Sequence, residues 1–287
     1  MSLSKKAVVK MTVRNGVRSL LPLPIRKHLS LWVHHQTWLD AGRRAWWSQE
    51  LVRDLADRDI NEYHKFLWSN HLSYAVSYEV ASRFGQENMK QSRKLFFADL
   101  KEHLAALSLD PGTDVRSAYE VGCSLGYQLR YLETDLFTAA SVLEGIDIDA
   151  YAIQAGTAYL KSIGSAVRLQ CGDMEHLEQV LGARRYDVIL CCGVLMYLDE
   201  ETAGRLVETL LRHTNIMLAF TGLAHPDNDN AQLGHSAPRE SDRSYIHNVD
   251  AMVEQAGGKV VARRWEGSTL LDGHTIYSVF ATGTRVA

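Results

Sequence analysis

The chain has 287 residues, of which 46% are hydrophobic and 23% are charged, and its formal net charge at pH 7 is −3. These fractions are close to the average for soluble globular proteins, which excludes disordered, collagen-like and coiled-coil classes, and no apolar run approaches the roughly 18–20 residues that cross a bilayer. The four cysteines lack metal-ligand spacing, so we expect a cytoplasmic protein with reduced thiols and no bound metal.

Residues 1–36 form a basic arm that ends before the first acidic residue, Asp40. The arm carries seven basic side chains: Lys5, Lys6, Lys10, Arg14, Arg18, Arg26 and Lys27. Its apolar residues include Leu20, Leu21, Leu23, Ile25, Leu29, Leu31 and Trp32. A segment that is both basic and apolar predicts peripheral contact with an anionic membrane surface. The alternative is a flexible start followed by a helix that packs on the main domain.

Residues 37–112 are predicted to form a helical region in front of the main domain. From Thr37 to Leu107 the sequence lacks proline and repeats apolar residues at three- and four-residue spacing. Aromatic residues gather in one part of it: Tyr63, Phe66, Trp68, Tyr74 and Tyr78. They predict either the buried face of docked helices or a lid over a ligand pocket. Pro111-Gly112 predicts the turn that ends this region.

Residues 113–287 are predicted to form an α/β domain, because short apolar runs alternate with amphipathic helices. The predicted strands are 116–122, 141–147, 166–170, 186–192, 215–221, 258–265 and 275–282. The predicted helices are 126–133, 150–162, 174–181, 200–213 and 247–256. The segment 266–274 is too short for a helical crossover, so the last two strands are expected to pair as an antiparallel hairpin.

A glycine-containing loop, Gly122–Gly126, follows the first predicted strand, and ligands of open α/β sheets bind at this edge. A dinucleotide pyrophosphate needs glycine at the first, third and sixth loop positions, which here are Gly122, Ser124 and Tyr127. Two of the three positions fail, and the carboxylate of Glu120 would repel a diphosphate. The same carboxylate suits a cationic ligand.

The pattern acidic-x-Gly-x-x-x-Gly, formed by Glu120, Gly122 and Gly126, resembles the first motif of the class I (Rossmann-like) S-adenosylmethionine-dependent methyltransferases. Three further segments resemble the family in the expected order: 144–149, 171–174 and 186–198. The resemblance covers residues 114–284. It implies a seven-stranded, mostly parallel sheet with an antiparallel final strand, behind the helical N-terminal region.

The resemblance also implies S-adenosylmethionine as cofactor, with S-adenosylhomocysteine as product. Asp147 would accept hydrogen bonds from the ribose hydroxyls, and Ile148 would pack on the adenine. Asp173 would bind the exocyclic amine, and the N–H of Met174 would meet a ring nitrogen. The other predicted cofactor contacts come from the first loop and from the turn after the fourth strand: Glu120, Gly122, Cys123, Ser124, Gly126, Cys192 and Gly193.

The long polar segment after the fifth predicted strand holds the candidate catalytic residues, His225 and His247. Histidine is suited to proton transfer near neutral pH, although histidines in polar loops often serve only as hydrogen-bonding groups. Asp227 and Asp229 alone do not make a metal-dependent site.

The acceptor is expected to be a small molecule or a glycan sugar, methylated on oxygen or, alternatively, on carbon. The fourth-strand turn, Cys191–Val194, lacks the Asn/Asp-Pro-Pro-aromatic form of many amino-group methyltransferases. The alternatives are a protein or RNA acceptor, or a non-catalytic cofactor-binding module. No nucleic-acid partner is expected, because acidic residues outnumber basic ones beyond the arm. The sequence leaves the oligomeric state open.

Overall fold

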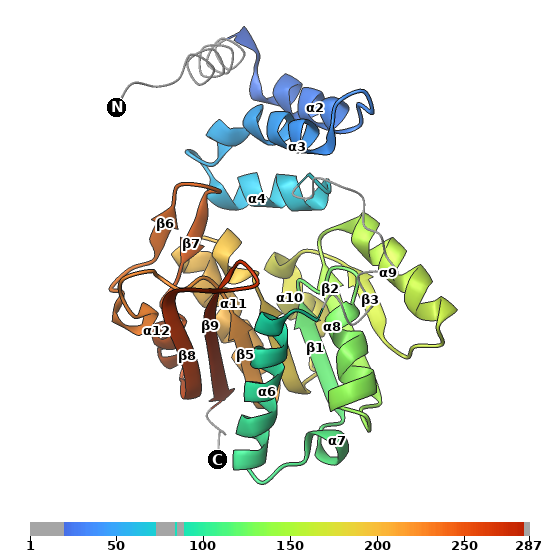
Figure 1. The fold of residues 1–287 in the computed structure, drawn as a ribbon, viewed down its shortest axis with the longest axis vertical. Helices are drawn as coiled ribbons and strands as arrows, with labels where there is room; N and C mark the ends of the chain where they lie inside the picture. The colour runs from blue at the N-terminus through green and yellow to red at the C-terminus, as the bar shows by residue number, and fades with distance from the viewer. Residues whose placement is uncertain (1–19, 73–83, 85–88, 284–287) are drawn as a thin grey trace. The chain divides into compact units, whose positions relative to one another are not determined.

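The computed structural model describes residues 20–72, 84 and 89–283, which Figure 1 traces along the chain. Contacts divide the chain into two units, Met1–Ser77 and Tyr78–Ala287. Each unit has a hydrophobic core of its own. Within the described ranges, no helix is both long and apolar enough to cross a membrane.

The first unit is helical where it is described. Its elements are α2 (Leu23–His34), α3 (Ala41–Glu50), the 3₁₀ turn η1 (Arg53–Leu55) and α4 (Ile60–Ser69). The side chains of Asp40 and Asp59 cap α3 and α4 by accepting hydrogen bonds from the N–H groups of Arg43 and Glu62. Each cap begins a new helix. The described part of the predicted helical region is therefore helical, as expected, but it is not one continuous helix.

The aromatic cluster predicted in this region contributes to the core of the first unit. Tyr63 is 4% exposed and packs with Val52, Leu55, Leu67 and Leu72. Phe66 packs against the same cluster. Tyr74 and Tyr78 lie outside the described residues. The buried-face interpretation therefore holds for Tyr63.

The second unit is built on one seven-stranded sheet of order β3-β2-β1-β4-β5-β9-β8. Its strands are β1 (Ser117–Val121), β2 (Val142–Asp147), β3 (Arg168–Cys171), β4 (Tyr186–Cys192), β5 (Thr214–Thr221), β8 (Gly258–Leu271) and β9 (His274–Gly283). The first five are parallel, and β9 pairs antiparallel with both β5 and β8. A separate hairpin joins β6 (Ala237–Arg239) to β7 (Ser244–Ile246). The predicted α/β fold is confirmed.

Helices and turns connect the strands of this unit. They are α6 (Gln91–Ala106), α7 (Pro111–Asp114), α8 (Tyr127–Tyr131), the π-helical turn η3 (Leu132–Leu136), α9 (Ala150–Ser162), η4 (Met174–His176), α10 (Leu177–Leu181), η5 (Leu195–Tyr197), α11 (Glu200–Arg212), η6 (Asn230–Gln232) and α12 (Val249–Gln255).

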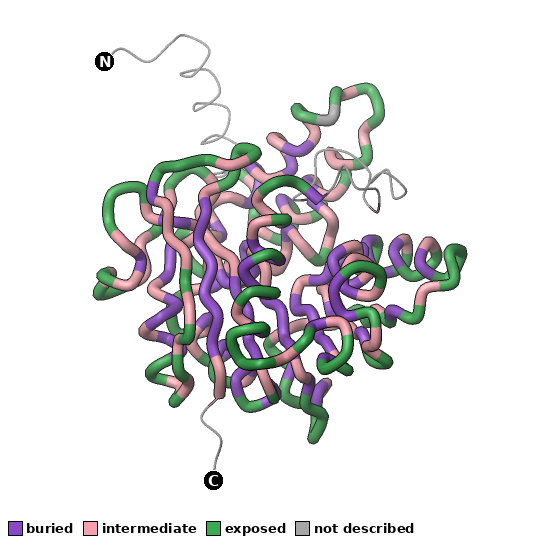
Figure 2. Tube along the Cα trace, turned by 60° about the horizontal axis from the view of Figure 1, so that its bottom comes forward, coloured by how far each residue is buried: buried purple, intermediate pink, exposed green. Residues whose placement is uncertain are grey.

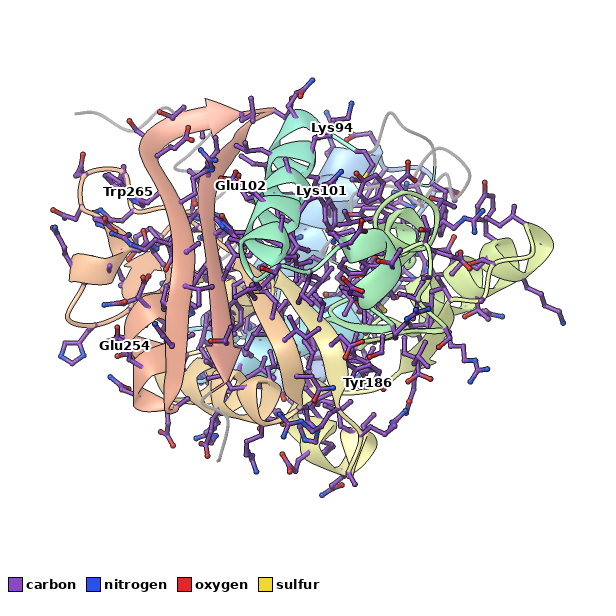
Figure 3. All side chains as sticks on the ribbon, turned by 90° about the horizontal axis from the view of Figure 1, so that it is seen from below. Lys94, Lys101, Glu102, Tyr186, Glu254 and Trp265 are labelled. Atoms are coloured by element: carbon purple, nitrogen blue, oxygen red, sulfur yellow. The ribbon has the colours of Figure 1, made fainter. Side chains whose placement is uncertain are left out.

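Alternate residues of β1, β4, β5 and β9 enter cores on opposite faces of the sheet, as the period of two requires. On β9, Phe280 packs in the cluster that contains Phe96 and Leu100 of α6. Its neighbour Val279 packs in the other cluster, with Val253 of α12. Figure 3 shows α6 and α12 on opposite sides of β8 and β9, and Figure 2 shows the middle strands as buried.

Helix α6 belongs with the sheet, although the sequence groups it with the helical region 37–112. Its buried residues Phe96, Phe97, Leu100 and Leu104 share a core with Val188 and Leu190 of β4. The division by contacts falls between residues 77 and 78, not at Pro111-Gly112. That dipeptide instead opens the short helix α7.

The final hairpin is confirmed as antiparallel, but its strands are longer than predicted. Strand β8 continues through residues 266–271, which the sequence pattern predicts as a loop, and Leu271 pairs with His274. The turn is therefore only Asp272-Gly273, with φ angles of 55° and 79°. Two left-handed residues are what a tight two-residue hairpin turn requires, and Asp-Gly is a favoured pair for it.

Candidate functional site

The loop from β1 to α8 turns sharply at the carboxyl edge of the sheet. Gly122, Ser124 and Gly126 have φ angles of 73°, 50° and 80°. A Cβ on Gly122 would lie 2.3 Å from Cγ2 of Val194, and one on Gly126 would lie 2.8 Å from Cδ2 of Leu169. Both the backbone angle and the space available therefore favour glycine at these two positions.

The same loop is tied to the next strand through the backbone. The N–H groups of Gly122 and Cys123 both donate to the carbonyl oxygen of Ile146, at 2.8 and 3.1 Å. The Cys123 side chain is 1% exposed and packs in the core, and burial raises the pKa of its thiol well above the ordinary value. Of the predicted loop contacts, Cys123 therefore turns its side chain into the core, and its carbonyl accepts from the N–H of Gly126 at 2.8 Å.

Asp147, at the end of β2, holds the loop in place with its carboxylate. One oxygen accepts from the N–H of Ser124 at 2.7 Å, and the other accepts from the N–H of Asp149 at 2.9 Å. Burial raises the pKa of Asp147, and hydrogen bonds from the backbone N–H groups of Asp149, Ser124 and Ile148 oppose that rise. Each carboxylate oxygen has a further lone pair, so both oxygens can still accept a hydrogen bond from a ligand hydroxyl.

Glu120 is the buried charge of the site. Its side chain is on β1 with 1% of the residue exposed, and Oε1 accepts a hydrogen bond from Nε2 of Gln128 at 2.7 Å. Oε2 is buried and has no hydrogen-bond partner among the described residues. Burial and the nearby Asp147 raise the pKa of Glu120 well above its ordinary value, while the guanidinium of Arg93 acts in the opposite direction. A cationic ligand would supply the missing partner.

The predicted adenine contacts follow β2 and β3. The N–H of Gly172 donates to the carbonyl of Asp147 at 3.0 Å, which brings the two strand ends together. Asp173 caps η4 by accepting from the N–H of Glu175 at 3.0 Å, through Oδ1. Met174 is half-buried against the core, and Ile148 is half-buried beside Asp147. These residues all lie at the same sheet edge as the first loop.

The turn after β4 completes this edge. Cys192 pairs in register with Thr221 of β5, and the N–H of Gly193 donates to the carbonyl of Thr221 at 2.9 Å. Gly193 has a φ of 68°, and a Cβ placed on it would meet no atom within 4 Å, so its backbone angle alone favours glycine. Burial raises the pKa of the Cys192 thiol well above its ordinary value, which keeps the thiol protonated.

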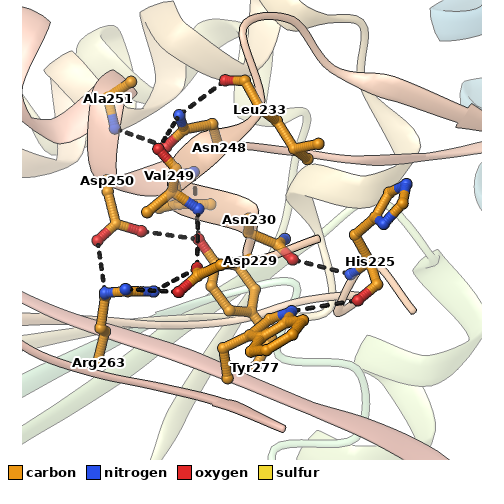
Figure 4. A network of polar contacts seen from close by, with 12 residues as sticks. His225, Asp229, Asn230, Leu233, Asn248, Val249, Asp250, Ala251, Arg263 and Tyr277 are labelled. Carbon is orange, nitrogen blue, oxygen red and sulfur yellow. Dashed lines mark hydrogen bonds and ion pairs between the residues drawn. The ribbon is translucent and has the colours of Figure 1, made fainter. Parts of the chain in front are cut away.

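His225, after β5, is held by its own loop (Figure 4). Its ring Nδ1 accepts hydrogen bonds from the N–H groups of Asp227 and Asn228, at 3.3 and 3.1 Å. Its backbone N–H donates to Asn230, and its carbonyl accepts from the indole of Trp265. Because Nδ1 is the acceptor, the neutral ring carries its proton on Nε2. This tautomer offers a ligand a donor and not a base.

His247 is buried in a different set of hydrogen bonds. Nε2 lies 2.8 Å from the carbonyl of Leu195, and Nδ1 lies 2.7 Å from Oγ of Ser236. The ring therefore donates through Nε2 and accepts through Nδ1. Burial lowers the pKa of His247. With both nitrogens engaged, the imidazole fixes η5 to the loop before β6.

The polar loop holds no metal-binding cluster in the part of the chain that the structure describes. Both carboxylate oxygens of Asp229 accept from the guanidinium of Arg263, at 2.5 and 2.6 Å. Asn230 donates to the carbonyls of Leu223 and His247, at 2.9 Å each. Figure 4 shows the Asp229–Arg263 pair and the hydrogen bond that Asn230 accepts from the backbone N–H of His225. These contacts therefore fix the shape of the loop.

Two residues near Glu120 were not predicted from the sequence. Gln128 lies on α8 and is recognised only by its contact with Glu120. Arg93 lies on α6, with its guanidinium 4.9 Å from the ring centre of Tyr127. Neither residue belongs to a sequence motif, because each is brought near Glu120 only when the chain folds.

Residues 118–215 match the family model described as a methyltransferase domain. No curated protein shows significant sequence similarity to the chain. Three solved structures share the fold at low identity. The magnesium protoporphyrin IX methyltransferase of Synechocystis PCC 6803, with bound SAH, is 15% identical, with a TM-score of 0.51 over 72% of this chain and 94% of that one.

A S-adenosylmethionine-dependent methyltransferase from Clostridium acetobutylicum is 11% identical, with a TM-score of 0.50 over 71% of this chain and 99% of that one. An amino pentose methyltransferase of calicheamicin biosynthesis from Micromonospora echinaspora, with bound SAM, is 16% identical. Its TM-score is 0.50, over 73% of this chain and 98% of that one. At these identities the likeness is one of fold.

Proposed function

We propose that this chain, whose residues 118–215 match the model of a methyltransferase domain, is a class I S-adenosylmethionine-dependent methyltransferase and that it methylates a hydroxyl group of a small molecule or of a glycan sugar. Methylation of carbon is the alternative reaction at the same site. The buried carboxylate of Glu120, with one oxygen unpartnered among the described residues, is the observation that carries the choice of cofactor.

The residues at the sheet edge fit S-adenosylmethionine. The cofactor supplies a methyl group on a sulfonium, and its second cation is an α-ammonium. Glu120 would neutralise this positive charge, and Asp147 would accept hydrogen bonds from the ribose hydroxyls. Gly122 and Gly126 allow the loop to turn sharply at this edge, and Asp173 would accept from the adenine amine. A diphosphate beside Glu120 would meet repulsion instead.

The geometry supports catalysis by positioning. Displacement at a methyl sulfonium needs the acceptor held in line and water excluded, which binding can supply without a dedicated base. The hydrogen bonds of His225 and His247 oppose a base role for either ring. The turn Cys192-Gly193 also differs from the turn that many amino-group methyltransferases use, which favours oxygen or carbon as acceptor. Two fold relatives are named for a porphyrin and an amino pentose, so this fold serves small acceptors.

The test is calorimetric titration of the full chain with S-adenosylhomocysteine, with NADH as a parallel ligand. We expect micromolar binding of S-adenosylhomocysteine alone, weakened about 100-fold or more in Asp147→Ala because two charge-assisted hydrogen bonds are lost. Asp187→Ala is the matched control. Asp187 also accepts from two backbone N–H groups, those of Arg116 and Ser117, but lies near the amino end of β4.

Binding of NADH alone would overturn the cofactor. Binding of neither ligand would indicate a non-catalytic module. Once cofactor binding is established, purified hydroxylated small molecules and sugars are offered with the methyl donor, and the methylated product is identified by mass spectrometry. Methylation of a protein or RNA in place of these acceptors would overturn the proposed acceptor class and leave the cofactor intact.

A further inference from the structure

Gln128 is a buried polar residue that the proposed reaction does not use directly. It is 7% exposed, it is the second residue of α8, and its amide donates to Oε1 of Glu120 at 2.7 Å. A buried glutamine loses both side-chain freedom and hydration, so its amide needs a hydrogen-bond partner inside the protein. The carboxylate of Glu120 is that partner.

The turn from β1 into α8 brings the two side chains together. Gly126 has a φ of 80° and turns the chain from the loop into the helix. Long side chains of a helix point back toward its N-terminal end, so Gln128 points toward the loop and the strand before it. Glu120 lies on that strand, eight residues earlier in the sequence. The sharp loop therefore places an amide donor beside the carboxylate.

This contact makes the two oxygens of Glu120 different. Gln128 engages Oε1, whereas Oε2 is buried and has no hydrogen-bond partner among the described residues. Rotation of the carboxylate would exchange the two oxygens only by breaking the contact with Gln128. One defined oxygen is therefore kept for a ligand, and it can accept a hydrogen bond from a cation.

The same contact favours the charged form of Glu120. Burial is the largest cause of the raised pKa of this carboxyl group, and Asp147 raises the pKa further. The guanidinium of Arg93 and the hydrogen bond from Gln128 act in the opposite direction. A hydrogen bond to a carboxylate stabilises the ionised form, which is the form that a cation requires.

We infer that Gln128 is a positioning residue for the amino-acid end of the cofactor: it holds Glu120 so that Oε2 faces the α-ammonium group, and it thereby helps to select ligands that carry this group. The inference rests on the proposed function, because its ligand is the cofactor proposed above. Gln128 acts through Glu120 and does not touch the reacting atoms. Its contribution should therefore vanish for a ligand without the ammonium group.

The experiment is calorimetric titration of the full chain with two ligands. They are S-adenosylhomocysteine and its desamino analogue, in which hydrogen replaces the α-ammonium group. Gln128→Met keeps the length of the side chain and removes the donor. We expect it to weaken binding of S-adenosylhomocysteine about tenfold, since a hydrogen bond to a charged group is lost. Binding of the desamino analogue should change by less than about twofold.

Tyr186→Phe is the matched control. The hydroxyl of Tyr186 also donates to a carboxylate, Oε2 of Glu144, at 2.6 Å, and Tyr186 is 2% exposed. It is the first residue of β4, at the amino end of that strand and away from the candidate site. The control variant should lose a comparable hydrogen bond and bind both ligands as the wild type does.

A double variant tests whether Gln128 acts through Glu120. Glu120→Gln/Gln128→Met should bind S-adenosylhomocysteine no more weakly than Glu120→Gln alone, because the contact that Gln128 supports is already lost. Gln128→Asn, which keeps an amide but is one methylene shorter, should show the same selective loss as Gln128→Met. Circular dichroism of each variant checks that it is folded.

The outcomes separate this inference from the proposed function. If the wild type fails to bind S-adenosylhomocysteine, the proposed cofactor is wrong and the inference falls with it. If the wild type binds it, three results would overturn the inference and leave the cofactor intact. They are an unchanged affinity in Gln128→Met, equal losses for both ligands, and additive losses in the double variant.

Discussion

Glu120 and Gln128 form a hydrogen-bonded pair that leaves half of a buried carboxylate unsatisfied. The amide of Gln128 donates to Oε1 at 2.7 Å, while Oε2 has no partner among the described residues. Burial and Asp147 raise the pKa of Glu120. The apo protein therefore binds a proton at this site more tightly than the unfolded chain does, and this difference has a measurable consequence for stability.

For Glu120→Gln we expect weaker binding of S-adenosylmethionine, by about tenfold or more, because a charge-assisted contact to a cation is lost. A raised carboxyl pKa makes the folded state lose stability as pH rises from the ordinary value of 4.5 towards the raised one. The variant lacks this group, so its unfolding free energy in urea should fall less than that of the wild type across that range.

Glu133→Gln is the control for the sign of this effect. Burial opposes ionisation of Glu133, but hydrogen bonds from Ser165, Ala166 and Arg130 hold its pKa below the ordinary value. Its contribution to stability is therefore present above the unfolded pKa and lost as pH falls. Glu133→Gln should lose stability at neutral pH and bind the cofactor normally. If Glu120→Gln binds the cofactor as tightly as the wild type, Glu120 does not face the cation.

Substitutions at glycines allow the energetic cost of a positive φ angle to be separated from the cost of a steric clash. Gly122→Ala should cost roughly 1 kcal/mol for its positive φ and about 1–3 kcal/mol more for the overlap with Val194. Gly164→Ala is the matched control, because Gly164 has a φ of 69° and a Cβ placed on it would meet no atom within 4 Å. It should show only the first cost, measured by urea unfolding.

Val194→Ala in the Gly122→Ala background should recover part of the lost stability, since the overlapping methyl is Cγ2 of Val194. The two changes should therefore be non-additive. Equal costs for Gly122→Ala and Gly164→Ala would contradict the clash. Cofactor binding, measured alongside, should weaken in Gly122→Ala and stay unchanged in Gly164→Ala.

The sheet was predictable because its signals are local. The helix 150–162 and the strand 186–192 are found within the predicted limits. Their signals, which are the periodicity of the apolar residues and the capping residue Asp149, lie in the same stretches of sequence. The extent of β8 was not predicted, although Asp272-Gly273 is a hairpin signal that would have shortened the loop. The small β6–β7 hairpin also lies in a segment that the sequence indicates only as polar.

Long-range pairing explains the other differences. In the sequence, Arg26 is one of the basic residues of the arm. In the structure it is buried and pairs with Asp54, 28 residues later. Nothing in the residues around Arg26 indicates that partner. In the same way, the candidate site could be predicted where a motif marks it, at Gly122, Gly126 and Asp147. The contribution of Gln128 depends on a contact that only the folded chain makes.

His225 tests whether a base is needed. Its Nδ1 accepts from two backbone N–H groups, so the neutral ring presents Nε2–H. We expect His225→Ala to lower turnover less than about tenfold, because a general base would be worth 100-fold or more. The pH profile of turnover should also lack a histidine step in this variant and in the wild type alike. A loss of 100-fold with cofactor affinity intact would restore the base assignment.

His247 should act on stability instead of chemistry. His247→Leu keeps the volume but leaves the carbonyl of Leu195 and the hydroxyl of Ser236 unpaired, at a cost of about 2–3 kcal/mol in urea unfolding. His235→Leu is the control, because the side chain of His235 is 91% exposed, and its cost should stay within about 0.5 kcal/mol.

The pH dependence of the His247 variant gives a second readout. Burial lowers the pKa of His247 from its ordinary 6.5, so the unfolded chain binds a proton there before the folded one does. The stability of the wild type should therefore be full above about pH 6.5 and decrease as pH falls from that value towards the lowered pKa. His247→Leu should show a shallower decrease over the same interval, when unfolding free energies of both proteins are compared. Parallel curves would mean that His247 is protonated equally in both states, and that its ring is not held by Leu195 and Ser236 in solution.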